Sequence, residues 1–510
     1  MIFRILNTWG EEEPNSKNEV CLVWDEWNDY SFYTLFGIFY VDENSKKHDL
    51  GGVKIAFLGQ QELDRVFEVG YTFEYIGDNY FSLGISEEYY EGLSKLPSHI
   101  REFILNRLND IAKKPEIYNL VKNEDVVTTS FFRSLSPTTV TSQFRRMANG
   151  GAKLTPYSFI FNRRNKDYSR TLSLSFDVVP ESLPPTNIHV LIGRNGAGKT
   201  NLINSMIDSL MVPNDLHPSM ESFTFNKASQ YDEVNSFANL ISVSFSAFDE
   251  VELRSEDIAF IDGIKYSYIG LRSQKSDGDS GFEIKDATIL PNEFYESLMI
   301  CKSRSLIDRL SEALLTLESD PNFRREAFVE LIRLDDSRKS KAAILIAFRR
   351  LSSGHKIILL TITKLIEKLQ EKSLVLMDEP EAHLHPPLLS AFVRTVSDLL
   401  IKTNGVAIIA THSPVILQEV PKSCVWKLRR SGNLLVSDRL TRESFGENVG
   451  ILTNDIFGLE VTDSGFYKML TENVENNNFD YESVMKSFNN QLGSEARYII
   501  MALIANSKKS

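Results

Sequence analysis

Residues Ile188 to Leu202 read IHVLIGRNGAGKTNL, and the rest of the chain can be arranged around them. The apolar run Ile188 to Ile192 predicts a buried strand, and the residues after Lys199 have the apolar spacing of a helix. Between them stands GRNGAGKT, residues 193–200, which fits the pattern G-x-x-x-x-G-K-[ST]. A strand, this loop and a helix in that order predict a phosphate-binding loop.

The residue types of this loop suit a nucleotide triphosphate and its magnesium ion. Glycines let backbone N–H groups close around a phosphate at a helix N-terminus, where the helix dipole favours negative charge. Lys199 is predicted to reach the terminal phosphates, and the hydroxyl of Thr200 to bind Mg²⁺. The alternative interpretation is a glycine-rich turn that matches the pattern by coincidence and binds no phosphate. The predicted nucleotide-binding residues are Gly193, Arg194, Asn195, Gly196, Ala197, Gly198, Lys199, Thr200 and Asn201.

Length and composition narrow the class of protein. A chain of 510 residues is expected to form two to four domains, and 42% hydrophobic and 25% charged residues are ordinary for a globular protein. The formal net charge of -13 argues against a general nucleic-acid coat protein, although a local basic patch stays open.

The cysteines and the N-terminal sequence predict a compartment. Cys21, Cys301 and Cys424 are far apart and form no C-x-x-C pair, which fits a reducing environment. No apolar run has membrane-spanning length, and the first residues turn acidic before a signal-peptide core can form. We therefore expect a cytoplasmic protein without a membrane partner.

The chain divides into three predicted regions. Residues 1–150 form an accessory region that is β-rich up to about residue 95 and then helical, ending at Asn149-Gly150-Gly151. Residues 151–440 form a nucleotide-binding domain with a helical insertion at about 290–350. Within the insertion, helices are expected from Asn292 to Leu317 and from Phe323 to Leu334, followed by a polar link, Asp335 to Lys341. Residues 441–510 are expected to be a mostly helical tail.

A second acidic motif follows another predicted buried strand. Leu374 to Met377 is apolar and runs into Asp378-Glu379-Pro380. Carboxylates at the carboxyl end of a central strand lie where ligands bind in open α/β sheets. Asp378 is predicted to hold Mg²⁺, and Glu379 to orient and deprotonate the attacking water. The alternative is a strand capped by an acidic turn.

Two further motifs flank this strand. Before it, Leu351-Ser352-Ser353-Gly354-His355-Lys356 opens an apolar helix, which by itself is an ordinary serine N-cap. After it, the apolar residues Ala407 to Ala410 run into Thr411-His412-Ser413-Pro414, which predicts a strand ending in a histidine beside the nucleotide.

Together, GRNGAGKT, LSSGHK, LVLMDEPEAHLHP and IIATHSP resemble the ATP-binding-cassette (ABC) ATPases of the recombination, repair and anti-phage defence branch, whose heads are like those of the SMC and OLD proteins. The resemblance covers about Tyr157 to Arg430. It implies an α/β fold, with a mixed P-loop NTPase sheet and a helical lobe, plus the accessory region. It also implies a slow, regulatory ATP hydrolase that uses ATP and Mg²⁺.

The resemblance implies a homodimer or a higher even-numbered oligomer, in which two chains sandwich two ATP molecules. Lys199, Glu379 and His412 are the implied catalytic residues of one chain, with Thr200 and Asp378 as its metal ligands. They would face Ser352, Ser353 and Gly354 of the other chain. His412 would contact the γ-phosphate, and the loop from Glu381 to Pro386 would couple the two sites. His383, His385 and His412 can alternatively be read as metal ligands.

The sequence departs from the family pattern at two points. The family usually has a glutamine at the end of the strand after the first helix, but Phe245-Ser246-Ala247-Phe248-Asp249 has none. Ser246 or Asp249 is then only a guess for that role. In the motif Leu351 to His355, which corresponds to the signature of the family, position five is His355 rather than glutamine or glutamate. The serine and the glycine that would bind the anion are intact.

No long heptad run lies between Thr200 and Leu351, which excludes the coiled-coil arms of chromosome-organising relatives. After His412 there is no Asp-x-Asp, so we predict no topoisomerase-primase (TOPRIM) nuclease domain. An ATPase without its own effector resembles the PtuA-type ATPases of Septu and retron defence systems. That resemblance implies a separately encoded HNH nuclease (PtuB-like) as partner and, in retrons, a reverse transcriptase with retron DNA.

Two other functions compete with a sensor and scaffold that controls a nuclease. One is an ATP-dependent DNA clamp in repair or recombination, for which the candidate phosphate contacts are Arg145-Arg146, Arg163-Arg164, Arg324-Arg325 and Arg349-Arg350. Charged pairs on helices are more often solvated faces. The other is the ATPase subunit of a membrane transporter, against which the missing glutamine and the EPEAHLHP loop argue.

Overall fold

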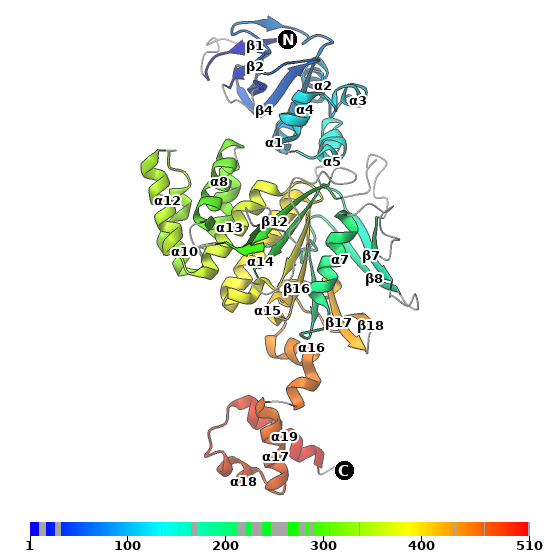
Figure 1. Ribbon diagram of the computed structural model, residues 1–510, viewed down its shortest axis with the longest axis vertical. Helices are drawn as coiled ribbons and strands as arrows, with labels where there is room; N and C mark the ends of the chain where they lie inside the picture. The colour runs from blue at the N-terminus through cyan, green and yellow to red at the C-terminus, as the bar shows by residue number, and fades with distance from the viewer. Residues whose placement is uncertain are drawn as a thin grey trace.

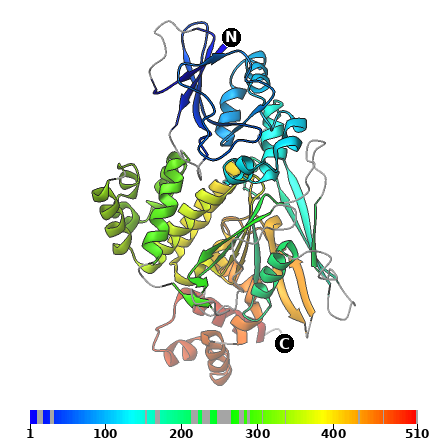
Figure 2. The same cartoon turned by 45° about the horizontal axis from the view of Figure 1, so that its top comes forward.

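The computed structural model describes residues 1–9, 17–25, 32–133, 135–151, 154–164, 171–211, 221–225, 237–245, 264–274, 282–285, 289–304, 306–335, 337–431, 434–463 and 465–507. Three parts follow one another along its longest axis (Figure 1). The N-terminal region and the C-terminal helices lie at opposite ends of a central head, as the turned view also shows (Figure 2).

The N-terminal region is a six-stranded sheet followed by helices, which confirms the expected β-rich start. The strand order is β5-β1-β2-β3-β4-β6. Neighbouring residues of β2 (Glu19–Trp24) point to opposite faces: Val20 and Leu22 join the main core, whereas Cys21 and Val23 join a smaller cluster on the other face. The other strands are β1 (Ile2–Leu6), β3 (Leu35–Val41), β4 (Lys47–Phe57), β5 (Thr72–Phe73) and β6 (Tyr80–Gly84).

Helices cover one face of this sheet and share its core, which extends from Phe3 to Ala148. They are α1 (Glu87–Ser94), α2 (Ser98–Arg107), α3 (Pro115–Val121), α4 (Asp125–Thr129), η1 (Phe131–Arg133), α5 (Pro137–Thr139), η2 (Val140–Phe144) and α6 (Arg145–Ala148).

The head is built on a seven-stranded mixed sheet, which confirms the predicted α/β class. Its order is β12-β11-β15-β16-β9-β17-β18, and every neighbouring pair is parallel except β17 with β18. These strands are β9 (Ile188–Gly193), β11 (Asn239–Ser244), β12 (Lys265–Gly270), β15 (Leu374–Asp378), β16 (Val406–Thr411), β17 (Val425–Ser431) and β18 (Leu434–Arg439).

Both faces of the central strands are buried, which is why they are apolar throughout rather than alternating. In β15, Val375 and Met377 pack into the core on one face, and Leu374 and Leu376 into the core on the other. The second face is covered by α7 (Lys199–Met211) and by a three-stranded antiparallel sheet of β10 (Glu221–Phe225), β7 (Tyr157–Arg164) and β8 (Thr171–Val178).

The first face carries the helical lobe and two long helices, α13 (Ser353–Lys368) and α14 (Pro386–Thr403), seen on the left of Figure 1. The helix expected at 292–317 is two helices, α8 (Ile289–Ser303) and α9 (Ile307–Leu317). The helix expected at 323–334 is also split, because Ala327 adopts a left-handed φ of 49° between α10 (Pro321–Glu326) and α11 (Phe328–Leu331). Part of the expected polar link is helical, since α12 (Arg338–Arg350) begins behind the cap Ser337.

The remaining elements are short or belong to the tail. The tail packs on its own small core around Leu470, Val474, Val484 and Ile500. These elements are β13 (Arg272–Gln274), β14 (Phe282–Ile284), η4 (Pro380–His383), α15 (Pro414–Leu417), η5 (Lys422–Cys424), α16 (Val449–Asp463), α17 (Gly465–Asn476), α18 (Tyr481–Ser487) and α19 (Ser494–Ser507).

The N-terminal region holds the turn between α13 and β15. The side chain of Gln370 accepts hydrogen bonds from the backbone N of Ser136 at 3.0 Å and from Oγ1 of Thr139 at 2.7 Å. Next to it, Nη2 of Arg146 lies 2.5 Å from Oε1 of Glu371, and both side chains are buried. The structure therefore contradicts the reading of Arg145-Arg146 as DNA contacts, because both residues are buried.

A buried carboxyl lies in the core of the N-terminal region. Asp110 accepts hydrogen bonds from the hydroxyl of Tyr90 at 3.0 Å and from the backbone N of Ala112 and of Lys113 at 3.0 and 2.9 Å. Burial raises the pKa of Asp110 from 3.8 to about 7, although these hydrogen bonds act in the opposite direction. The folded chain therefore binds one more proton than the unfolded chain between these two pH values.

We expect Asp110→Asn to flatten the pH dependence of stability. Because the folded-state pKa is raised, the contribution of Asp110 is complete below pH 4 and is lost as the pH rises through 7. Between pH 5 and 8 the native chain should lose roughly 2–3 kcal/mol that the neutral asparagine variant keeps. Denaturant unfolding at both pH values measures this difference. The exposed Glu62→Gln in the same region is the control, and equal pH dependence in all three proteins would contradict the assignment.

Candidate functional site

Three parallel strands bring their polar ends to one edge of the head sheet. Strand β16 lies between β15 and β9, and pairs Asp378 with Ala410 and Thr411 with Ile192. The residues that follow each strand therefore meet at the same edge. This register brings together the loop after Gly193, the Asp378-Glu379 pair and His412.

The phosphate loop depends on its glycines for close packing and for backbone conformation. A Cβ on Gly193 would lie 2.5 Å from the carbonyl oxygen of Leu428 on the neighbouring strand. Gly196 and Gly198 have φ values of +76° and +99°, which L side chains rarely adopt. The loop then enters α7 at Lys199. A backbone of this shape at a helix N-terminus fits a bound phosphate.

Lys199 lies across this loop and is buried. Its Nζ donates to the carbonyl oxygens of Gly193 at 3.1 Å and Arg194 at 3.3 Å, and lies 3.8 Å from Oε1 of Glu379. The neighbouring Asn201 accepts a hydrogen bond from Arg163 at 2.7 Å. Lys199 therefore connects the phosphate loop with the end of β15.

Glu379 is held in an unusual backbone conformation. Its φ is +44°, in the left-handed region that costs energy for a residue with a Cβ. Its backbone N donates to the carbonyl oxygen of Ala410 at 2.9 Å, which fixes the turn. Its carboxylate, one-third exposed, lies between Lys199 and His412. A carboxylate beside a lysine and still open to solvent is placed to contact a water molecule.

His412 is oriented by Glu381, whose role sequence reasoning did not identify. Oε1 of Glu381 accepts hydrogen bonds from the hydroxyl of Thr411 and from the backbone N of His412, the latter at 2.9 Å. Nδ1 of His412 lies 3.3 Å from the same oxygen and 3.5 Å from Oε1 of Glu379. The imidazole is half-exposed, so it is available to a ligand at this edge.

The residues present fit ATP and Mg²⁺. Asp378 is buried at the end of β15, and Thr200 is half-buried in the first turn of α7. A carboxylate and a hydroxyl are hard oxygen ligands of the kind that Mg²⁺ takes together with phosphate oxygens. When bound, the ion would neutralise phosphate charge.

The signature serines stand at the exposed tip of α13. Ser352 caps the helix and accepts a hydrogen bond from the backbone N of His355 at 3.5 Å, and its Oγ is 2.6 Å from Nδ1 of His355. Ser353 is exposed. Among the described residues, no hydrogen bond or ion pair joins Ser352, Ser353 or Gly354 to the phosphate loop.

His355 of the signature contacts a buried carboxylate. Nε2 of the buried His355 lies 3.1 Å from Oδ1 of Asp320, and Oδ2 of Asp320 lies 3.4 Å from Nε2 of His385. Burial raises the pKa of Asp320, but hydrogen bonds from His355 and from backbone N–H groups bring that pKa below its ordinary value. Asp320, which no sequence motif indicated, thus links the signature to the loop after β15.

The same loop touches the signature through Gly354. A Cβ on Gly354 would lie 2.4 Å from the carbonyl oxygen of His383. Two of the three histidines that can alternatively be read as metal ligands have different partners, because His385 contacts Asp320 whereas His412 contacts Glu379 and Glu381. In the described parts of the chain no cluster of side chains is suited to a metal ion held by protein alone. Ser246 and Asp249 lie outside the described residues.

We expect Lys199→Ala to weaken ATP binding. Loss of a charged hydrogen-bond donor corresponds to about 1.5–3 kcal/mol, so the dissociation constant should rise by at least about tenfold. Calorimetric titration with ATP and Mg²⁺ measures it. Lys468→Ala, an exposed lysine of α17, is the control. Unchanged affinity in the Lys199 variant would show that the loop does not bind nucleotide through this residue.

One family model matches part of the head. The family described as "AAA domain, putative AbiEii toxin, Type IV TA system" matches residues 310–418. Two solved ATP-binding cassettes of ABC transporters, one in an ADP conformation and one nucleotide-free, are 15% and 14% identical, with TM-scores of 0.28 and 0.27. Each covers 52% of this chain, and 84% and 85% of the cassettes are matched. TM-scores this low carry no functional argument.

None of the described helices is both long and apolar enough to cross a membrane.

One full-length relative is more informative than the solved structures. Protein ea59 of Escherichia phage lambda is 39% identical over 529 residues, which span 99% of this chain and 98% of ea59. The chain therefore belongs to the same family as protein ea59 of Escherichia phage lambda.

Proposed function

We propose that the chain is a slow ATP hydrolase that works as a dimeric switch. The observation that carries this proposal is the division of the site. Lys199, Glu379 and His412 converge at one sheet edge, whereas Ser353 is exposed on a helix tip with no bond to them. A helix N-terminus attracts phosphate. Two copies in opposite orientation would each complete the other's site.

In this proposal each residue has one task. Lys199 binds the terminal phosphates, and Asp378 with Thr200 holds Mg²⁺. Glu379 orients the attacking water and accepts its proton, because its carboxylate is partly exposed and beside Lys199. His412, positioned by Glu381, contacts the outermost phosphate. Hydrolysis removes the contact that holds the two copies, so the dimer loosens.

We further propose that this switch controls a separately encoded effector, a nuclease of the HNH kind as in PtuA-type systems, during phage infection. Support comes from a head without a recognised nuclease motif and from a full-length relative encoded by phage lambda. The name of the matching family mentions a Type IV toxin–antitoxin system. The relative is encoded by phage lambda, so the proposed switch acts either for a phage or for its host.

We expect Glu379→Gln to slow hydrolysis by at least about 100-fold, as removal of a general base commonly does, while ATP binding is kept. The variant should then accumulate as a dimer with ATP, measured by light scattering after size exclusion. Adding Ser353→Arg, which touches no described contact in the chain, should return it to the monomer. Ser98→Arg, at the equivalent first position of α2, is the matched control.

Either of two outcomes would contradict the switch. One is unchanged turnover in Glu379→Gln. The other is an ATP-dependent dimer that the Ser353 substitution leaves intact. The effector is tested separately: the product of the neighbouring gene should copurify with the chain, and deleting the chain should change the plating efficiency of phage. If neither happens, the effector proposal is wrong even where the ATPase works.

A DNA clamp remains the second candidate, favoured by the placement of Arg349 and Arg350. Both are exposed at the end of α12, directly before the signature that would face a second copy. Duplex binding that strengthens with ATP and weakens steeply with salt would support it. Arg349→Gln with Arg350→Gln should then reduce the salt dependence, and no DNA binding at low salt would exclude this function.

A further inference from the structure

Helix α12 of the helical lobe is basic along its exposed face. Its 13 residues include five lysines or arginines and no aspartate or glutamate, although the whole chain has a formal net charge of -13. Arg338 and Lys339, the N-terminal pair, are exposed at its start, and Arg349 and Arg350, the C-terminal pair, are exposed at its end. In an acidic chain this helix is a local positive surface.

The two pairs lie on the same face of the helix. Residues eleven positions apart are separated by three helical turns, so the C-terminal pair stands in line with the N-terminal pair, about 16 Å further along the axis. The opposite face is buried, and Phe348 there stacks on Phe294 of α8 with ring centroids 4.9 Å apart. Helix α12 therefore presents both pairs outward, on the side of the lobe away from the head sheet (Figure 1).

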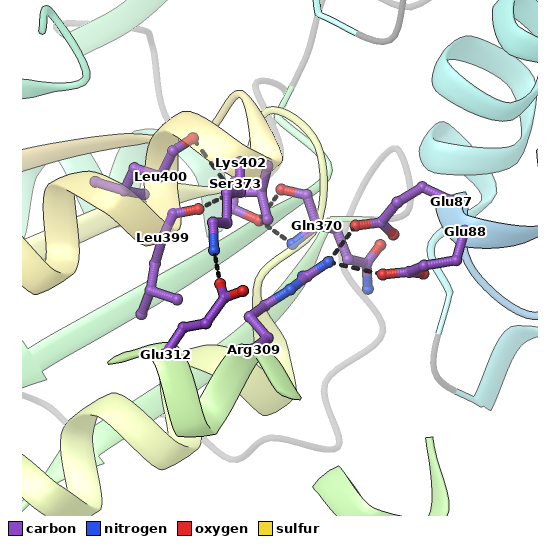
Figure 3. Close-up of polar contacts among 10 residues, drawn as sticks. Glu87, Glu88, Arg309, Glu312, Gln370, Ser373, Leu399, Leu400 and Lys402 are labelled. Atoms are coloured by element: carbon purple, nitrogen blue, oxygen red, sulfur yellow. Dashed lines mark hydrogen bonds and ion pairs between the residues drawn. The ribbon is translucent and has the colours of Figure 1, made fainter. Parts of the chain in front are cut away.

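Cations on other helices of this face of the head are neutralised. Arg309 of α9 lies 2.6 Å from Glu87 and 3.0 Å from Glu88 of α1 (Figure 3). Lys402 of α14 forms an ion pair with Glu312 of α9, drawn in the same view. In contrast, no carboxylate in the part of the chain that the structure describes forms an ion pair with either pair of α12. Their charge is available to a partner.

The stability of the helix does not explain these charges. Ser337 already caps α12 by accepting a hydrogen bond from the backbone N of Ser340 at 3.3 Å, and Asp335 accepts hydrogen bonds from the hydroxyls of both serines. The helix dipole is positive at this end, so the N-terminal pair is unfavourable there. A local rule that is broken without a structural gain is typical of a functional surface.

We propose that the exposed face of α12 binds the phosphate backbone of a double-helical nucleic acid. Two cationic pairs about 16 Å apart match an anion that stays negative over that whole length. A nucleic-acid duplex carries one charge for about every 1.7 Å of its axis, so it reaches both pairs at once. Between the pairs, the exposed side chains of Ala342 and Ile346 have no polar group to read base edges. The contact is therefore with phosphates and independent of base sequence.

This inference does not rest on the proposed switch. Binding through α12 needs one chain and no nucleotide, whereas a DNA clamp needs ATP and a second copy to close. The two are still neighbours, because α12 ends at Arg350 and the signature helix α13 begins at Ser353. A duplex on α12 would lie beside the helix tip that the switch presents to a second copy.

The test uses the full chain without nucleotide, titrated with fluorescently labelled duplexes of about 20 base pairs and followed by anisotropy between about 50 and 200 mM salt. DNA and RNA duplexes are both used, since both offer the same phosphate chemistry. We expect saturable binding of both that weakens steeply with salt. Replacing all four residues of the two pairs by glutamine should weaken binding at least tenfold at the lowest salt. It should also reduce the slope of log K against log salt by roughly 3, at about 0.9 per lost phosphate contact.

Two further variants separate a local contact from misfolding and from net charge. Exchanging arginine and lysine at the same four positions keeps the charges and should retain binding. The matched control removes four exposed lysines outside the lobe and should bind as the native chain does: Lys46→Gln, Lys95→Gln, Lys122→Gln and Lys468→Gln. The Tm of the four-glutamine variant of α12 should not fall, because the helix dipole disfavours the N-terminal pair.

Four outcomes would overturn the proposal. They are no saturable binding of either duplex at the lowest salt, binding that the four-glutamine variant of α12 leaves unchanged, an equal loss in the matched control, and binding that appears only with ATP. The last would assign the contact to the clamp instead. A poly-glutamate peptide is the competitor: if it displaced the duplex at equal charge concentration and bound as tightly, α12 would be a surface for an acidic protein.

Discussion

The parallel pairing of β9, β16 and β15 is the constraint on which the site depends. A parallel ladder aligns strand ends of the same polarity, so one register fixes three loops at once. Asp378 is opposite Ala410, and Thr411 is opposite Ile192. This register alone makes the phosphate loop, the acidic pair and His412 neighbours. A slip of one residue would turn Asp378 away from this edge and bury Met377 on the wrong face.

The N-terminal region is attached to the head at the point where signature and sheet are joined. A buried ion pair such as Arg146 with Glu371 contributes little net stability, because both charges lose their hydration. Its effect is orientation: with one partner displaced, a charge would be buried alone. Together with Gln370 it fixes one relative position of the two parts. The accessory region is thereby attached to the segment that joins α13 to β15.

Motifs that are local in sequence were predictable, and contacts between distant residues were not. The buried strands, the phosphate loop and the Asp378-Glu379 turn follow from apolar runs next to glycines and carboxylates. The role of Asp320 and the contact of Glu381 with His412 escaped prediction because their partners, His355 and His412, are 35 and 31 positions away. The same reason explains the error at Arg146: an arginine pair reads as a solvated or DNA-binding face until Glu371, 225 positions on, is placed against it. Apolar periodicity continues across the breaks at Ala327 and between α8 and α9. It therefore predicted one helix where the structure has two.

Asp320 connects the signature with the loop after β15. One carboxylate has two oxygens, and here one holds His355 of the signature while the other lies near His385 of the loop after β15. With Gly354 packed against the carbonyl oxygen of His383, signature tip and loop form one unit. That loop begins at Glu379, whose strained turn sets its carboxylate beside Lys199. The contacts of Asp320, Gly354 and Glu379 therefore connect the helix tip that carries Ser353 with the carboxylate beside Lys199 within one chain.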